Sequence, residues 1–468
     1  MDNEAEQFDC LIIGGGQGAS LAAQLAKAGR KTAVIERADF GGTCVNRGCT
    51  PSKTLIASAR VAQYARTSQS WGVRTGEVSV DMQAVISRKR AVVDDFRSSV
   101  EGALRIPNLS ALHGEASFTA PRTVQVLAGG QARLFKAPTV VIATGSSPAP
   151  PKIEGLDSVS WLDSTSIMEL SEVPEHLLIL GGGTIAVEFA QVFRRFGARV
   201  SIIERGARLL SREDEDVAHA VQDILAEDGI QISCGSQVRK ISGAGGQVTL
   251  QVLDGEGGAA REVSGSHLLV ATGRQPNTES LNLEAAQVER DEHGFVRVDE
   301  FLSTNQEGVF ALGDVAGSAP FTHIAFDDGR ILADRLLKNK RRSTKERIAT
   351  WTMFLDPQLG RTGLSEAEAS SKGLQFEVAR IEMKDVARPL EVNEPRGFWK
   401  VLVERGSGQI LGGSFLSIEG GEMSALCLVA MTGKVPYQTL RDLPISHPTL
   451  AESWNNLFLK LDRERPKP

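Results

Sequence analysis

Two cysteines separated by four residues are the feature of this sequence best suited to redox chemistry. Cys44 and Cys49 lie in a glycine-rich run (residues 41–53), and Thr50 and Pro51 follow the second cysteine directly. Thr is a common N-cap and Pro a common first helical residue, so we predict that a helix begins here with Thr50 as its N-cap. A helix N-terminus favours the thiolate form of Cys49. The spacing therefore indicates a reactive dithiol rather than a structural disulfide.

Glycine turns of the dinucleotide-binding kind occur twice in the chain. In the first copy, an apolar strand (8–13) leads through the glycines into a helix (20–26) and a second strand (32–35) that ends in an acid. The second copy repeats this order with a strand at 177–180, a helix at 187–193 and a strand at 200–203. The glycines let a pyrophosphate approach the helix N-terminus, and the acid suits a ribose hydroxyl. These positions are Gly14, Gly16, Gly18, Ala19 and Glu36 in the first copy, and Gly181, Gly183, Ala186 and Glu204 in the second.

Three further apolar strands end in turns that resemble ligand-binding edges. The runs 140–145 and 268–273 both end in Ala-Thr-Gly, and the run 309–314 ends in Gly-Asp. Ligands of open α/β sheets bind at the carboxyl ends of the strands. These turns therefore contribute the candidate binding residues Thr144, Gly145, Gly273, Arg274 and Asp314.

The hydrophobic pattern of the sequence changes near residue 348. Alternating runs at 398–403 and 410–415 predict antiparallel strands, and helices are expected near 422–431 and 452–460. Glycine clusters at 243–246 and 255–258 predict hairpin turns. At 468 residues the chain has room for about three domains.

Composition excludes several classes of function. The net charge is −6, with 41% hydrophobic and 24% charged residues, so nothing favours nucleic acid or an anionic membrane. No apolar run reaches the roughly 18 residues of a membrane span, and the acidic N-terminus lacks signal-peptide features. We expect a cytoplasmic protein without a metal site. Cys10, Cys234 and Cys427 are expected to be inert apolar side chains.

The run 41–53 resembles the active-site signature of the class I flavoprotein disulfide reductases, the pyridine nucleotide-disulfide oxidoreductase family. This family includes dihydrolipoamide dehydrogenase, glutathione reductase and mercuric reductase. The resemblance extends over nearly the whole chain, through both glycine turns and the Gly-Asp turn to the run 447–452. It implies an α/β fold with two Rossmann-like FAD/NAD(P)-binding domains, an α+β C-terminal dimerisation domain, and a homodimer. The implied division is FAD-binding at 1–150 and 276–347, NAD(P)-binding at 151–275 and interface at 348–468.

The resemblance also implies how the cofactors bind. The first unit is expected to hold FAD and the second a nicotinamide nucleotide, with an ion pair between Lys53 and Glu188 beside the flavin. The strand 113–116 resembles the segment that contacts the adenine. The implied FAD residues are Gly14, Gly16, Gly18, Glu36, Gly42, Thr43, Lys53, Gly114, Ala116, Thr144, Gly145 and Asp314. The implied nicotinamide residues are Gly181, Gly183, Glu204, Gly273 and Arg274.

Catalytic roles follow from the same resemblance. Cys49 is expected to face the flavin as a charge-transfer thiolate, and Cys44 to attack the acceptor. His447 is expected to act as acid–base from the other subunit, with Glu452 orienting its imidazole. The implied catalytic set is Cys44, Cys49, His447, Glu452, Lys53 and Glu188.

The nucleotide and the acceptor are open at this stage. Glu204 disfavours a 2′-phosphate and so favours NADH, but Arg205 and Arg208 follow it and suit NADPH. The presence of His447 and Glu452 favours a disulfide acceptor, either a small molecule or a protein.

Two alternatives to a disulfide reductase stay open. Reduction of Hg(II) or Cu(II) at the same dithiol is one, although mercuric reductases typically add a C-terminal cysteine pair and the last cysteine here is Cys427. A flavin-bearing redox sensor with poor turnover is the other. Arg47, between the cysteines, departs from the small or apolar residue usual in the family. Three roles are open for Arg47: it lowers the pKa of a cysteine, it attracts an anionic acceptor, or it is a solvated side chain without a role in the reaction.

Overall fold

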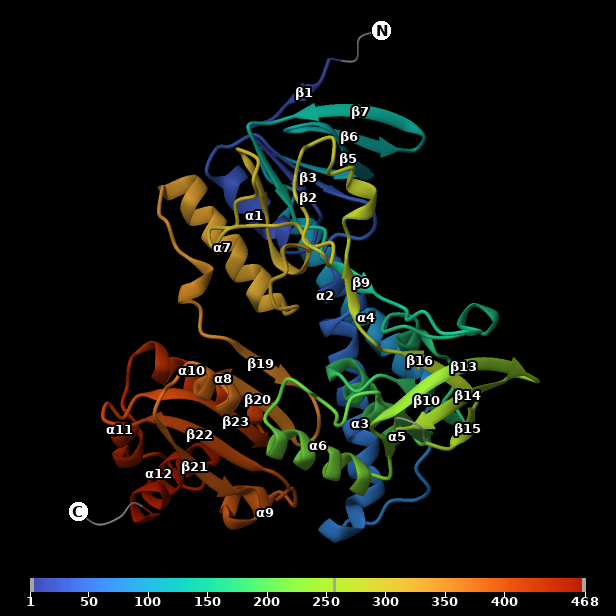
Figure 1. Cartoon of the computed structure of the whole chain (residues 1–468), viewed down its shortest axis with the longest axis vertical. Helices are drawn as coiled ribbons and strands as arrows, with labels where there is room; N and C mark the ends of the chain where they lie inside the picture. Colours follow the sequence, from blue (N-terminus) through green and yellow to red (C-terminus); the bar gives the residue numbers. More distant parts are fainter. Residues whose placement is uncertain (1–3, 256–257, 465–468) are drawn as a thin grey trace.

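The first sheet of the protein is parallel and contains the first glycine turn. The computed structural model describes residues 4–255 and 258–464 (Figure 1). Strand β18 returns to this sheet after the whole second unit, so the second unit is inserted within the first. The order is β18 (Val309–Ala311), β8 (Thr139–Ile142), β2 (Cys10–Ile13), β3 (Thr32–Glu36) and β4 (Leu109–His113).

The second sheet has the same parallel character and contains the second glycine turn. Its order is β12 (Gln231–Ser233), β11 (Arg199–Ile203), β10 (His176–Leu180) and β16 (His267–Val270). The central strands of both sheets are continuous buried runs, as expected for strands covered on both faces. The two predicted Rossmann-like units are therefore confirmed.

Three small sheets flank the parallel ones, and their strands pair antiparallel except for β1, which lies parallel to β7. They consist of β1 (Glu6–Gln7), β7 (Gln131–Lys136), β6 (Thr123–Ala128) and β5 (Glu115–Ala120); of β13 (Ser236–Ala244), β14 (Gln247–Asp254) and β15 (Ala260–Gly265); and of β17 (Arg274–Pro276) and β9 (Ser146–Pro148). The turn predicted at 243–246 joins β13 to β14. The turn predicted at 255–258 includes residues 256–257, which lie outside the described residues.

Helices cover the parallel sheets and carry the dithiol. The helix after each glycine turn has the predicted place: α1 (Gln17–Lys27) in the first unit and α5 (Thr184–Phe196) in the second. The long helix α3 (Cys49–Thr67) runs from the centre of the molecule along α5 (Figure 1). The other helices of this half are α2 (Gly42–Arg47), α4 (Met82–Ala103), α6 (Glu215–Glu227) and α7 (Thr322–Lys338).

The C-terminal sheet is antiparallel and separates two cores. Alternate side chains of a strand point to opposite faces, so Phe398 and Leu416 pack with the second unit while Trp399 and Phe415 pack with the C-terminal helices. The order is β19 (Thr350–Met353), β20 (Gln358–Gly363), β23 (Ile410–Ser417), β22 (Phe398–Glu404) and β21 (Phe376–Glu382). Its helices are α8 (Glu366–Ser371), α9 (Ala387–Glu391), α10 (Gly420–Thr432), α11 (Tyr437–Asp442) and α12 (Ser453–Glu464).

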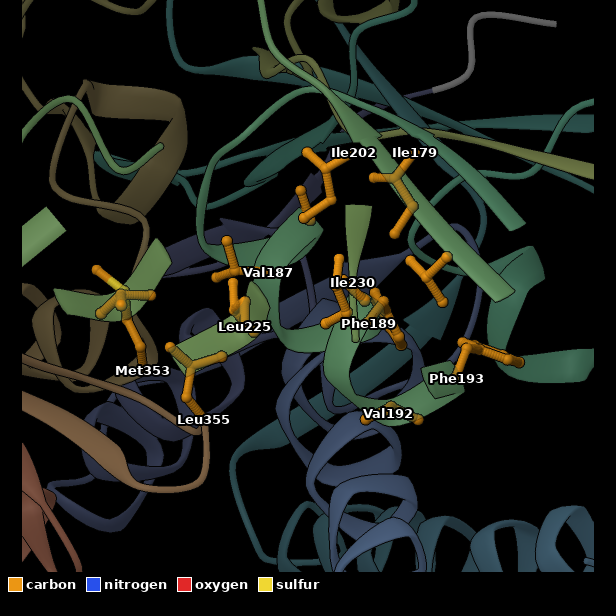
Figure 2. Close-up of a cluster of buried hydrophobic side chains, with 14 of the residues drawn as sticks. Ile179, Val187, Phe189, Val192, Phe193, Ile202, Leu225, Ile230, Met353 and Leu355 are labelled. Atoms are coloured by element: carbon orange, nitrogen blue, oxygen red, sulfur yellow. The ribbon is translucent and has the colours of Figure 1, made fainter. Parts of the chain in front are cut away.

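One hydrophobic core joins the second unit to the C-terminal sheet. Met353 and Leu355 belong to the same cluster as Val187 and Leu225 of the second unit (Figure 2). Leu55 and Ala59 of α3 belong to it as well. The helix that begins at the dithiol is therefore held between the two. Among the described residues, no helix is long and apolar enough to cross a membrane.

Candidate functional site

The dithiol lies where α2 ends and α3 begins. Cys44 lies in α2, and Cys49 is the first residue of α3 with Gly48 as the N-cap residue. The prediction of Thr50 as N-cap was wrong by two positions, because the chain is already helical at Cys49. The first-turn N–H groups of a 19-residue helix thus lie next to the Cys49 sulfur. Both cysteines are free thiols in this structure.

A hydroxyl group from a distant segment contacts the Cys49 sulfur. Thr322, the first residue of α7, places its Oγ1 3.4 Å from Cys49 Sγ. The Cys44 thiol, by donating to this sulfur, lowers the pKa of Cys49 to about 6, and Thr322 and Lys53 act in the same direction against burial. The same hydrogen bond, together with burial, raises the pKa of Cys44. Cys49 is therefore the thiol that ionises first.

An ion pair joins the dithiol helix to the second unit. Lys53 Nζ lies 2.8 Å from Glu188 Oε2, and the Glu188 side chain is only 8% exposed. Glu188 Oε1 accepts a hydrogen bond of 2.8 Å from the backbone N–H of Phe354, whose ring lies 4.8 Å from Lys53 Nζ. Helices α3 and α5 and the C-terminal segment are thus held together one turn away from Cys49.

One cavity of about 2110 Å³ connects the dithiol with both glycine turns. Gly18 is not in its wall; it packs beneath the turn, where an added Cβ would lie 2.8 Å from Ile12. The wall includes these predicted residues: Gly14, Gly16, Glu36, Gly42, Thr43, Cys44, Cys49, Lys53, Gly114, Ala116, Thr144, Gly145, Gly181, Gly183, Glu188, Glu204, Gly273, Arg274 and Asp314.

The first glycine turn is tightly enclosed. An added Cβ on Gly42, which has a φ of +60°, would lie 2.7 Å from the Cα of Gly16. Glu36 accepts hydrogen bonds from the N–H groups of Gly15 (2.7 Å) and Ala38 (2.8 Å). The N-cap Gly16 of α1 supplies no side-chain acceptor, so the first-turn N–H groups suit the pyrophosphate of FAD. Asp314, which accepts from Ser146 Oγ at 2.5 Å, lines the same cavity.

The second glycine turn is open at its third glycine, Gly183, although Gly181 and Gly182 are packed about as closely as Gly14 and Gly15. No described atom lies within 4 Å of an added Cβ on Gly183, the N-cap residue of α5. Glu204 accepts one backbone hydrogen bond, from Gly206 N–H at 2.5 Å. Arg274 donates to Ser146 Oγ at 2.8 Å and faces the cavity. This arrangement suits a nucleotide that enters and leaves from solvent.

His447 and Glu452 form a pair, but the described chain does not bring it to the cavity wall. His447 Nδ1 lies 2.9 Å from Glu452 Oε2, and the His447 side chain is 74% exposed. Leu450, between them, packs in the core with α12, whereas α3 packs on the other face of the C-terminal sheet. Figure 1 shows α12 on the side of this sheet away from α3. Within one subunit the sheet separates His447 from Cys44.

Several neighbours of the dithiol were not found from the sequence. Thr322 and Phe354 contact site residues from far along the chain. No sequence motif marks these contacts, because each depends on how β19 and α7 pack together. Arg47 Nη2 lies 3.3 Å from Asp39 Oδ2 with both side chains nearly half exposed, the geometry of a surface ion pair.

Comparison with protein families gives two matches that together cover most of the chain. Residues 8–329 match the pyridine nucleotide-disulphide oxidoreductase family, and residues 349–458 match the dimerisation domain of that family. The C-terminal domain predicted from the resemblance is therefore confirmed as a dimerisation domain.

Comparison with individual proteins gives full-length relatives. The chain is 34% identical to the probable pyridine nucleotide-disulfide oxidoreductase RclA of Escherichia coli over 97% of its own length and 99% of the relative. It is 35% identical to a mercuric reductase of Streptomyces lividans (95% and 94%) and 31% identical to a dihydrolipoyl dehydrogenase of Chlamydia muridarum (96% and 96%). A solved structure, the Cu(II) complex of the HOCl-induced flavoprotein disulfide reductase RclA from E. coli, superposes with a TM-score of 0.89 at 34% identity, covering 97% of this chain and all of that one.

Proposed function

The chain belongs to the pyridine nucleotide-disulphide oxidoreductase family, and from this premise we propose that it reduces a disulfide acceptor with NADH through Cys44 and Cys49. It is an FAD- and NAD(P)H-dependent oxidoreductase that acts on disulfide or related groups. FAD, when bound, supplies the two-electron link between nicotinamide and dithiol. The observation that carries the proposal is the Cys49 sulfur at the start of α3, in a cavity lined by both glycine turns.

The two thiols have different roles in the proposed reaction. Cys44 attacks a sulfur of the acceptor and forms a mixed disulfide, which releases the first acceptor thiol. The Cys49 thiolate then displaces the second thiol and closes the Cys44–Cys49 disulfide. Regenerating the dithiol consumes one hydride from NADH and one proton. Overall, one NADH, one proton and one disulfide are consumed, and one NAD⁺ and two thiols are formed. The lowered pKa of Cys49 keeps this thiolate available near neutral pH.

The acid–base group is proposed to be His447 of the partner subunit. The C-terminal sheet separates His447 from Cys44 within one chain, so the pair with Glu452 serves the site only across a dimer. Helix α10 is apolar on its exposed side, where Leu426 is 46% and Val429 69% exposed. Exposed apolar surface on a dimerisation domain is typical of a subunit interface. We therefore propose an obligate homodimer with two composite sites.

NADH is the proposed nucleotide. The Glu204 carboxylate lines the cavity at the strand end where the adenine ribose binds in such folds, and it repels a 2′-phosphate. Arg208, the residue that suited NADPH in the sequence, donates to the carbonyl groups of Ser211 and Glu213. Arg205 lines the cavity and is a feature that favours NADPH.

A metal ion is the second candidate acceptor. A relative was solved as a Cu(II) complex and others are mercuric reductases, so the same chemistry is proposed here as the alternative. Two thiolates close together bind soft metal ions well. The pair of His447 and Glu452 favours the disulfide, because transfer of a proton to a leaving thiol needs such a group.

A steady-state acceptor screen tests the proposal. Purified FAD-loaded protein is assayed with NADH and NADPH against lipoamide, glutathione disulfide, Cu(II) and Hg(II). We expect NADH with a disulfide to be fastest, and His447→Ala to slow that reaction by about 10²–10⁴-fold. Fast reduction of a metal ion that His447→Ala leaves unchanged would favour the second candidate. Failure to consume NADH with every acceptor in the screen, despite a flavin that NADH reduces, would favour a redox sensor.

We also propose a division of the chain into domains and a cellular location. The flavin-binding part is assigned to residues 1–150 and 276–347, the nucleotide-binding part to 151–275 and the interface to 348–468. The inserted position of the second sheet supports this division. A reducing compartment such as the cytoplasm suits a dithiol that must be reduced in every turnover.

A further inference from the structure

The loop that follows the second glycine unit is docked onto the C-terminal sheet. We define the nucleotide loop as residues 205–213, between β11 and α6. Its middle is tied to the glycine turn, since Leu210 N–H donates to Gly182 O at 2.9 Å. Its end, Glu213, is 2% exposed and accepts from Arg361 Nη1 and Trp351 Nε1, both at 3.0 Å. Arg361 and Trp351 belong to β20 and β19, so another domain holds the end of the loop.

The residues after the loop strengthen this docking. Asp214 and Asp216 lie 3.0 Å and 2.6 Å from Lys400 Nζ of β22, and Lys400 is 2% exposed. Glu366 completes the group at 2.7 Å from the same ammonium. These three carboxylates are close enough to hold a metal ion, but the Lys400 ammonium is already paired with all three, and Arg380 pairs with Asp216 as well. The cluster is therefore a joint between domains.

Arg208 is kept out of the cavity by the shape of the docked loop. Its Nη2 donates to the carbonyl groups of Ser211 and Glu213, each at 3.4 Å. Its Nε is buried without a hydrogen-bond partner in the described structure. Among the described residues of the loop, Arg205 and Arg212 line the cavity and Arg208 does not. A guanidinium with long bonds and one unsatisfied N–H gains a better partner wherever an anion comes within reach.

We propose that the buried Glu213–Arg361 pair selects NADH over NADPH, by fixing the nucleotide loop in the form that withholds Arg208 from the ribose 2′-position. This inference rests on the proposed use of NADH and names the residues that enforce it. Glu213, Arg361 and Trp351 act as positioning residues, since their hydrogen bonds to one another fix the end of the loop on the C-terminal sheet. Selectivity then has two sources: Arg208 is withheld from the 2′-phosphate of NADPH, and the Glu204 carboxylate repels that phosphate.

The test compares two nucleotides in matched variants of the FAD-loaded protein. For Glu213→Gln we expect the ratio of kcat/KM for NADH to that for NADPH to fall about tenfold, the scale of one charge-assisted contact. The value of kcat at saturating NADH should not change. Calorimetric dissociation constants for NAD⁺ and NADP⁺ should shift in the same sense without turnover. An unchanged ratio and unchanged affinities in a folded Glu213→Gln protein would overturn the proposal.

A double-mutant cycle identifies Arg208 as the released group. Arg208→Gln alone should leave the ratio within about twofold, and the Glu213→Gln/Arg208→Gln protein should lose the gained NADPH use. A large change in Arg208→Gln alone would mean that Arg208 already binds the nucleotide, which contradicts the proposal. If Glu213→Gln does not fold, Glu213→Leu with Arg361→Met removes both buried charges and leaves neither unpaired.

Controls separate this inference from the assignment of the nucleotide. Arg380→Gln removes a half-exposed pair with Asp216 on the same joint and should change the ratio less than about twofold; a tenfold change there would contradict a specific role for Glu213. A wild-type protein that prefers NADPH contradicts the proposed use of NADH. A wild-type preference for NADH that Glu213→Gln leaves intact contradicts only the anchoring by Glu213.

Discussion

The two glycine turns share one motif, but their surroundings differ. At the first turn, Gly42 of the next helix packs against Gly16, and Glu36 accepts two backbone N–H groups. At the second, Gly183 has open space around it, and Glu204 accepts one N–H group. The motif therefore specifies what binds, while the packing around it determines whether the ligand stays. An enclosed turn suits a cofactor held through many turnovers, and an open turn suits a substrate that exchanges.

The largest expected effect comes from crowding the enclosed turn. Gly42→Ala places a Cβ 2.7 Å from Gly16 at a φ of +60°, which costs a few kcal/mol by strain and clash. We expect FAD affinity to fall by about 10²-fold or more, measured by the flavin absorbance that the purified protein retains. Gly183→Ala is the matched variant of the open turn and should keep full flavin. Equal flavin loss in both variants would remove the contrast between the turns.

Loss of the acid should destabilise the protein more at the first glycine turn than at the second. Glu36→Ala leaves two N–H groups without their acceptor, whereas Glu204→Ala leaves one. We expect Glu36→Ala to lower the free energy of unfolding by about 2 kcal/mol and Glu204→Ala by about 1 kcal/mol, measured with urea. Glu204→Ala should also raise the KM for NADH about tenfold. The contrast is wrong if Glu204→Ala destabilises more than Glu36→Ala does.

Motifs with a fixed local spacing could be predicted from the sequence. The strand, turn, helix and acid of both units lie within a few residues of the predicted positions, because hydrophobic runs and glycines encode them locally. The C-terminal strands were found by alternation for the same reason. The beginning of α3 was misplaced, because Gly48 and Cys49 adopt the helical start that Thr50 and Pro51 also suit.

The dithiol lies against the enclosed unit, and its acidity should depend on a residue there. Because the pKa of Cys49 is lowered to about 6, its thiolate is present above that pH and is lost as the pH falls through it. Thr322→Val removes one hydrogen-bond donor, so the midpoint should rise by about one pH unit. The long-wavelength absorbance of the two-electron-reduced protein against pH measures this midpoint. Thr50→Val, at a neighbouring position of α3, is the control, and an equal shift there would discount Thr322.

The smallest expected effect concerns the other thiols. Cys10 lies buried in β2 of the enclosed unit, and burial raises its pKa to about 11; Cys234 is half-buried beside the open unit. Iodoacetamide should therefore label Cys234 faster than Cys10 or the buried Cys427, with mass spectrometry as the readout. Cys234→Ser should change turnover less than about twofold, since surface substitutions of this kind are mild. Faster labelling of Cys10 would show that the first unit is the more open of the two.

Contacts between distant segments could not be read from the sequence. Thr322 meets Cys49, and Glu213 meets Arg361, only after α7 and β20 have packed against other elements. No periodicity or motif links such positions, and each side chain alone resembles an ordinary polar residue. The role proposed for His447, completing the site of the partner subunit, was implied by family resemblance. Its physical reason, a sheet between the imidazole and the sulfur of its own chain, needed the structure.

The return of β18 to the first sheet has a consequence for how the chain is made. The ribosome releases β2, β3, β4 and β8 early, but their partner β18 emerges only after the complete second unit. The insert is continuous in sequence and can close its own sheet first, since domains generally fold as units during synthesis. The cavity that Asp314 lines, just beyond β18, is therefore finished late. Until then the early strands expose an unpaired edge, which is where a chaperone would be expected to bind.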